Sequence, residues 1–201
     1  MHQGHSDKIL IGSPRTLFKP ATWLAKIDFI NHLILFNNVL ITVLSEKNGG
    51  KTSFTTLLQS NLDDQIKSIF MTIKPPCDRE QIISDMAAQL HLNYDSDADL
   101  ANLAKQINER KAHVLLIIDD AHHLPEALIT EMMWVIKNQE DFGFFHLCLV
   151  SDYSIIATLN NLAVDPFNNL IHSIELSSLN ENETRIYVLQ RAMSARLINK
   201  P

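Results

Sequence analysis

The chain has 201 residues, of which 46% are hydrophobic and 20% charged, and its formal net charge is −6. This length suits one domain, or one domain with a small appendage, and the composition excludes disordered and collagen-like chains. The acidic balance offers no basic footprint for nucleic acid. No apolar run approaches the roughly 18 residues that a membrane span requires, and the first residues show no signal-peptide pattern.

The two cysteines, Cys77 and Cys148, are far apart and match no metal or redox motif. Cys148 lies inside an apolar run, which predicts a buried thiol. A reducing, cytoplasmic setting fits this cysteine usage best.

The first half of the chain alternates strand and helix patterns after a segment, residues 1–16, that is expected to be flexible. Residues 38–44 are apolar and β-branched, as in a strand, and a helix is expected to open at Ser53. Residues 68–73 form the next strand candidate, and the helix 78–91 follows with Asp78 as its cap.

The same alternation continues to the end of the chain. Asp95 or Ser96 can cap a helix before the strand 113–118, which is apolar after its first residue, as expected of a strand covered on both faces. Pro125 suits the first turn of a helix that reaches about residue 140. The remaining segments are a strand at 144–150, a short helix at 154–162, a strand at 171–176 and a helix at 180–197 capped by Asn180 with Glu183.

Strands that alternate with helices predict an α/β fold: a five-stranded parallel sheet with helices on both faces. We expect one domain over residues 17–197 and the start of a linker at 198–201.

Only five glycines occur in the chain, and two of them, Gly49 and Gly50, are adjacent in the turn between the first strand and its helix. The turn has the spacing G-x-x-x-x-G-K-[ST] of a phosphate-binding P-loop, with Ser45 in the place of the first glycine. Its backbone N–H groups and the helix N-terminus would bind phosphate, Lys51 would reach the β- and γ-phosphates, and Thr52 would ligate Mg²⁺. The residues expected to bind ATP or ADP are Ser45, Glu46, Lys47, Asn48, Gly49, Gly50, Lys51, Thr52 and Ser53.

Two alternatives bear on this turn. It could be an ordinary strand–turn–helix with a solvated lysine. Ser45 would cost about 1 kcal/mol relative to glycine if the first position of the loop required a positive φ.

Two carboxylates, Asp119 and Asp120, follow the apolar strand 113–118. Because ligands bind at the carboxyl ends of parallel strands, Asp119 is expected to face the Mg²⁺ shell and Asp120 to approach an attacking water. The alternative is a strand that simply ends in solvent, where Asp is common. The adjacent His122 and His123 lack partner ligands at a supporting spacing, so we do not assign a metal site to them.

This constellation resembles an AAA+ ATPase core with a reduced or absent lid. Residues 18–20 (F-K-P), 113–124 and 174–191 resemble segments of the ExeA (general secretion pathway protein A) group. The Asp119-Asp120-Ala121 variant and residues 149–154 are most similar to the N-terminal ATPase-like domain of DamX-type cell-division proteins. That resemblance implies a membrane helix and a peptidoglycan-binding SPOR domain further along the full-length protein.

Departures from the family pattern imply weak hydrolysis. AAA+ enzymes usually carry Glu where this chain has Asp120, and no arginine occurs between Arg110 and Arg185. An arginine finger is worth about 10³-fold or more in rate.

The leading hypothesis is therefore a slowly hydrolysing nucleotide switch or assembly module at the cytoplasmic face of the inner membrane. Its expected partners are envelope or cell-division proteins and a second copy of the domain, without nucleic acid. The alternatives are an active ATPase that energises secretion-type machinery and a degenerate domain that only binds proteins.

Overall fold

The computed structural model describes residues 18–94, 99–140, 143–167 and 169–198. Residues 21–178 form one compact unit, and the described residues on either side of it belong to a second. No helix in these described ranges is both long enough and apolar enough to cross a membrane.

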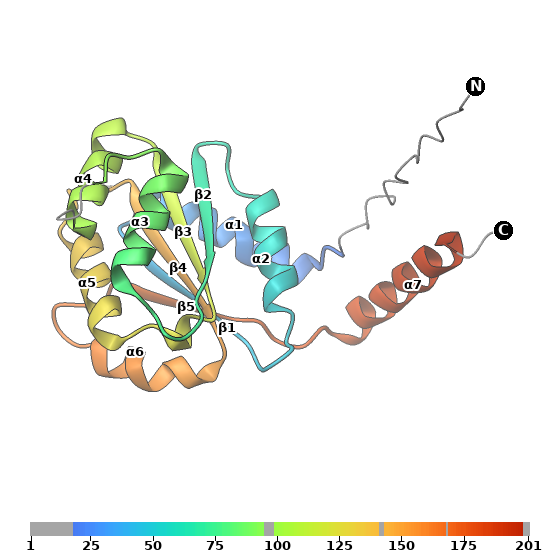
Figure 1. The fold of residues 1–201 in the computed structure, drawn as a ribbon. Helices are drawn as coiled ribbons and strands as arrows, with labels where there is room; N and C mark the ends of the chain where they lie inside the picture. The colour runs from blue at the N-terminus through green and yellow to red at the C-terminus, as the bar shows by residue number, and fades with distance from the viewer. Residues whose placement is uncertain (1–17, 95–98, 141–142, 168, 199–201) are drawn as a thin grey trace, which may run out of the picture. The chain divides into compact units, whose positions relative to one another are not determined.

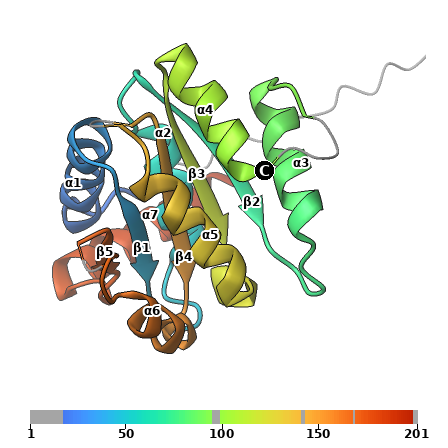
Figure 2. The ribbon, with the colours of Figure 1, turned by 90° about the vertical axis from the view of Figure 1, so that its left-hand side faces the viewer.

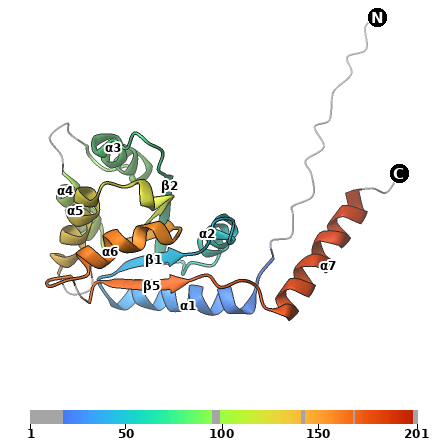
Figure 3. The same ribbon diagram turned by 90° about the horizontal axis from the view of Figure 1, so that it is seen from below.

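The first unit is built on a sheet of five parallel strands, as the sequence predicts (Figure 1). The strands stand in the order β2-β3-β4-β1-β5. Seen from below, β1 and β5 run side by side in the same direction (Figure 3). The bounds of the strands are Leu40–Leu44 for β1, Ile66–Thr72 for β2, His113–Asp119 for β3, Phe145–Ser151 for β4 and Ile171–Glu175 for β5.

Helices cover both faces of this sheet, which confirms the predicted α/β class (Figures 1 and 2). The helices α3, α4, α5 and α6 lie on one face, and α1 and α2 lie on the other. The bounds in this unit are Ala21–Phe36 for α1, Lys51–Ser60 for α2, Arg79–Leu90 for α3, Leu100–Arg110 for α4, Glu126–Lys137 for α5 and Ile156–Leu162 for α6, with short 3-10 turns η1 at Ala121–His123 and η2 at Tyr153–Ile155.

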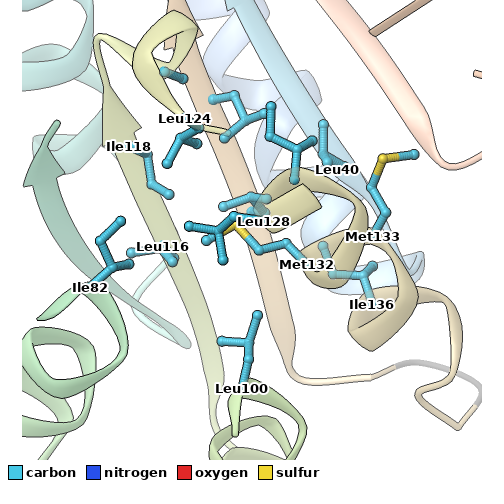
Figure 4. Packing of buried hydrophobic residues seen from close by; sticks show 14 of the residues in the cluster. Leu40, Ile82, Leu100, Leu116, Ile118, Leu124, Leu128, Met132, Met133 and Ile136 are labelled. Atoms are coloured by element: carbon cyan, nitrogen blue, oxygen red, sulfur yellow. The ribbon is translucent and has the colours of Figure 1, made fainter. Parts of the chain in front are cut away.

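The central strands are buried on both faces because helices cover each side. Alternate side chains of β3, including Leu116 and Ile118, enter the cluster formed with α3, α4, α5 and α6, which also holds Leu128 and Met132 of α5 (Figure 4). The residues between them, such as Ile117, are equally buried. The apolar run without polar alternation is thus explained by packing on both sides.

The structure corrects several helix boundaries. The helix α2 begins at Lys51, two residues before the expected Ser53, and η2 precedes α6 where one short helix was expected. The helix α5 ends at Lys137 rather than near residue 140. After it, the side-chain amide of Gln139 exchanges two hydrogen bonds, of 2.8 and 2.9 Å, with the backbone of Phe145. Gln139 thus belongs to the connection that leads into β4.

The predicted N-terminal cap is correct for α3 and wrong for α4. Asp78 caps α3 by accepting the N–H of Glu80 at 3.0 Å. The cap of α4 is Asp99, which accepts the N–H of Asn102 at 2.8 Å, so the expected cap at 95 or 96 is wrong. Those two positions lie outside the described residues. The cap was ambiguous in the sequence because Asp95, Ser96, Asp97 and Asp99 are all residue types that favour caps.

The second unit contains the last helix, α7 (Glu181–Ile198). Asn180 and Glu183 form the expected capping box: Asn180 Oδ1 accepts the N–H of Glu183 at 2.9 Å, and Glu183 Oε2 accepts the N–H of Asn180 at 3.1 Å. The rings of Phe18 and Tyr187 meet edge to face in this unit, with centroids 5.4 Å apart.

Candidate nucleotide-binding site

The strand order brings the candidate residues to one edge of the sheet. The last residue of β1, Leu44, pairs with Ser151 of β4, and Val150 of β4 pairs with Asp119 of β3. Neighbouring strands lie about 4.8 Å apart, so the turn after β1 and the carboxylates after β3 are separated by roughly 10 Å. The carboxyl end of β4 lies between them.

The turn after β1 meets the backbone demands of a P-loop without strain at Ser45. Positive φ values occur at Asn48 (65°) and Gly50 (87°), and Ser45 is not among the positive-φ residues. Asn tolerates the left-handed region and Gly enters it freely. The cost considered for Ser45 therefore does not arise.

The interior of the turn is filled by Ser45, whose side chain is fully buried. A Cβ added at Gly49 would lie 2.7 Å from Ser45 Oγ and 2.9 Å from the carbonyl oxygen of Glu46. That carbonyl accepts three hydrogen bonds, from Ser45 Oγ at 3.0 Å, Gly49 N–H at 2.9 Å and Lys51 Nζ at 3.2 Å. The turn leaves no room for a side chain at position 49.

The start of α2 presents unpaired donors. Its N-cap, Gly50, offers no side-chain acceptor, and the first helical bond runs from Phe54 N–H to the Gly50 carbonyl. Within the described ranges, the N–H groups of residues 51–53 meet no backbone acceptor. Donors of this kind, with the positive end of the helix dipole and the Lys51 ammonium, fit phosphate.

Asp119 is half-buried at the end of β3. Burial raises the pKa of its carboxyl, and the N–H of Asp120, which donates to Asp119 Oδ1 at 3.0 Å, opposes that rise. The charges of Lys51 and His122 also lower this pKa. A cation beside a desolvated carboxylate stabilises its ionised form, so Asp119 with the exposed hydroxyl of Thr52 suits Mg²⁺ chemically.

Asp120 occupies a left-handed turn position, with φ 55° and ψ 38°, at the start of η1. Asp is one of the residues that tolerate this region. The position directs the chain away from the strand immediately after Asp119.

Sequence reasoning did not assign a role to the contact between Ser151 and His122. Ser151 is fully buried; its carbonyl accepts the Ser45 N–H at 3.2 Å, and its Oγ lies 3.4 Å from His122 Nδ1. Ser151 thus joins the turns that follow β1, β3 and β4. The available signal was the polar Ser151-Asp152 pair directly after an apolar strand.

Asp152 adds a carboxylate to the same edge. The side chain and the N–H of Ser154 both donate to it and lower its pKa, and the charges of His122 and Lys51 lower it further. Among the described residues, no group of three or more His, Cys, Asp or Glu side chains is placed to hold a metal ion. Any magnesium here would therefore need hydroxyl, phosphate or water oxygens as ligands as well.

Comparison with known proteins identifies the family. The AAA domain family matches residues 36–150, and no match was found among curated proteins. Cdc6p from Pyrobaculum aerophilum is 20% identical, with a TM-score of 0.66 over 90% of this chain and 52% of that chain. The ADP form of the Aeropyrum pernix ORC2 protein is 14% identical, with a TM-score of 0.69 over 90% and 54%. The ORC1 protein of Aeropyrum pernix in complex with DNA is 12% identical, with a TM-score of 0.63 over 90% and 50%.

The chain therefore belongs to the AAA domain family, and its fold is that of an AAA+ P-loop nucleotide-binding domain. It spans about half the length of the three solved chains.

Proposed function

We propose that this domain binds ATP or ADP with Mg²⁺ through residues 45–53. The observation that carries the proposal is the turn before α2. The N–H groups of residues 51–53 have no backbone acceptor among the described residues, and the Lys51 ammonium lies in the same turn. Gly49 leaves the turn without a side chain at its position. The turn lies at the same end of the sheet as Asp119. Lys51 would neutralise the β- and γ-phosphates, and Thr52 and Asp119 would hold Mg²⁺. The direct test is titration calorimetry of the protein with MgADP, in which absence of binding at millimolar ligand would contradict the proposal.

We further propose that hydrolysis is slow. Asp120 is one methylene shorter than Glu, and the described chain between Arg110 and Arg185 offers no arginine that a neighbouring copy could use. Both features weaken the positioning of water and the neutralisation of charge in phosphoryl transfer.

Turnover by the purified domain is expected to fall well below about 1–100 s⁻¹, the range typical of kinases. Asp120→Asn should reduce any residual turnover while leaving MgADP affinity largely unchanged, because the carboxylate acts on water rather than on phosphate. A coupled ATPase assay beside calorimetry measures both quantities. Rapid turnover that survives Asp120→Asn would remove the role assigned to Asp120 and favour an active ATPase.

The contacts of Ser151 support the proposal that nucleotide binding changes the conformation of this edge of the sheet. Because Ser151 contacts both Ser45 and His122, phosphate that orders the turn after β1 would also order the ends of β3 and β4. Tyr153, 39% exposed in η2, lies two residues beyond Ser151 and would be part of the altered surface.

The resemblance to DamX-type and ExeA-type proteins supports an envelope or cell-division partner at the inner membrane. On this proposal the protein is tethered through a membrane helix encoded beyond Pro201. We expect the native reading frame to continue into an apolar segment of about 20 residues. A stop codon at that point would contradict the tether and leave a P-loop protein with another partner.

A nucleic-acid role is not favoured. Four of the similar structures contain DNA, but identities of 11–13% support a shared fold only. The net charge of −6 opposes the phosphate contacts that dominate DNA affinity. A mobility-shift assay at low salt would detect such binding.

A further inference from the structure

Trp23 of α1 lies directly against the turn that precedes α2. Its side chain is 6% exposed, and a Cβ built at Gly50 would stand 2.9 Å from Cη2 and 3.2 Å from Cζ2 of the indole. The same ring meets Phe54 edge to face, with centroids 5.6 Å apart and planes at 81°. Helix α1 thus contributes one large rigid side chain to the back of the turn.

The conformation at Gly50 decides where the first donors of α2 point. Gly50 is the N-cap, with φ 87° and ψ 12°, and residues 51–53 carry the N–H groups without backbone acceptors. Glycine has more accessible backbone states than any other residue, so its own chemistry does not hold it in this one. The restraints at this position are the hydrogen bond from the Phe54 N–H to the Gly50 carbonyl, at 2.8 Å, and the indole of Trp23 beside it.

We propose that Trp23 is a positioning residue for the phosphate-binding turn: its indole packs on Gly50 and Phe54 and holds the first N–H groups of α2 in the orientation that faces phosphate. The inference rests on the proposed nucleotide site for its functional meaning, while the positioning itself is a property of the free protein. Position 50 then requires glycine for two separate reasons: its φ is positive, and the indole of Trp23 leaves no room for a Cβ.

Substitutions can separate the contact between Trp23 and Gly50 from the general contribution of a buried aromatic side chain to the core. Trp23→Leu keeps an apolar side chain but removes the ring that reaches Gly50. Phe145→Leu is the matched control, because Phe145 is fully buried at the opposite end of β4 from Ser151 and its loss also leaves a cavity. Trp23→Phe is the second variant, which retains an aromatic ring should the leucine variant fail to fold.

The deciding experiment is hydrogen–deuterium exchange of the nucleotide-free protein on peptides that cover residues 45–54. The readout is the hydrogen-bonded amides of the turn, which are those of Ser45, Gly49 and Phe54. Trp23→Leu should speed exchange there by about tenfold relative to wild type, because the turn opens locally more often. Trp23→Phe should have a smaller effect, and Phe145→Leu should leave this segment unchanged at a matched loss of melting temperature. Unchanged exchange in both Trp23 variants, or an equal increase in the Phe145 control, would overturn the positioning role.

Calorimetry with MgADP then separates this inference from the proposed function. If the wild type binds MgADP and Trp23→Leu loses roughly threefold to tenfold in affinity, both the positioning role and nucleotide binding are supported. Faster exchange without any wild-type binding would retain the positioning role and contradict nucleotide binding. Normal binding by the Trp23 variants together with unchanged exchange would overturn the positioning role alone.

Discussion

Replacement of Lys51 by alanine is expected to weaken MgADP and MgATP binding by about ten- to a hundredfold. A charge-assisted hydrogen bond to phosphate contributes roughly 1.5–3 kcal/mol, and each 1.4 kcal/mol corresponds to about a factor of ten in affinity. The protein itself should remain folded, because Lys51 is half-buried and, in the part of the chain that the structure describes, its ammonium donates only to the Glu46 carbonyl, at 3.2 Å. Calorimetric titration of wild type and variant gives the ratio of dissociation constants.

The matched control is Lys105→Ala, which removes an exposed lysine from the middle of α4. It changes the net charge by the same amount without touching the turn. Equal losses of affinity in the two variants would show that Lys51 acts through net charge alone. An unaffected Lys51→Ala variant would contradict its placement at the phosphates.

The second large effect that we expect is on the pH dependence of stability, and it comes from a pair of histidines at the end of the sheet opposite the nucleotide-binding turn. His146 of β4 is fully buried, and its Nε2 lies 3.1 Å from His113 Nδ1. Its Nδ1 has no hydrogen-bond partner among the described residues. Burial, with a smaller contribution from His113, lowers the pKa of His146 to about 3. Burial also lowers the pKa of His113, against the opposing charge of Asp63.

The free energy of unfolding should therefore fall as the pH is lowered from about 6.5 towards 3. In that window the unfolded chain binds a proton at His146 and the folded chain does not, so acid favours the unfolded state. One such group changes the free energy by about 1.4 kcal/mol per pH unit, or on the order of 2–3 kcal/mol between pH 6.5 and 4.5. Urea unfolding measured across this range gives the slope directly.

His146→Leu should flatten this part of the pH profile, because it removes the group that resists protonation. The comparison variant is His32→Gln, which deletes an exposed imidazole from α1. A wild-type profile that matches His146→Leu throughout would mean that His146 gains its proton in the folded protein. Equal flattening in the His32 variant would rule out burial as the cause.

Much of this protein was predictable because its signals are local. The runs that became β1, β3 and β4 are apolar and of strand length, and each ends within two residues of the predicted boundary. The G-K-T triplet at 50–52, placed between a strand and a helix, predicted a phosphate-binding turn from the sequence alone. Asn180 and Glu183 identified the start of α7 for the same reason: a cap is made by residues three apart.

The tertiary structure alone decided which distant segments meet. No pattern in the sequence states that β4 lies between β1 and β3, yet this order is what places Ser151 against Ser45 and His122. Likewise, Trp23 has the sequence signature of an ordinary buried residue of α1, and only helix packing brings it to Gly50.

The physical reason is the range of the interactions. Caps, turns and apolar periodicity follow from bonds within a few residues, so a single sequence displays them. The order of parallel strands depends on crossover connections and on the summed packing of two helix layers, in which many side chains contribute small amounts. The sequence therefore determined the elements and the chemical class of the turn, and packing decided which side chains share the edge of the sheet where that turn lies.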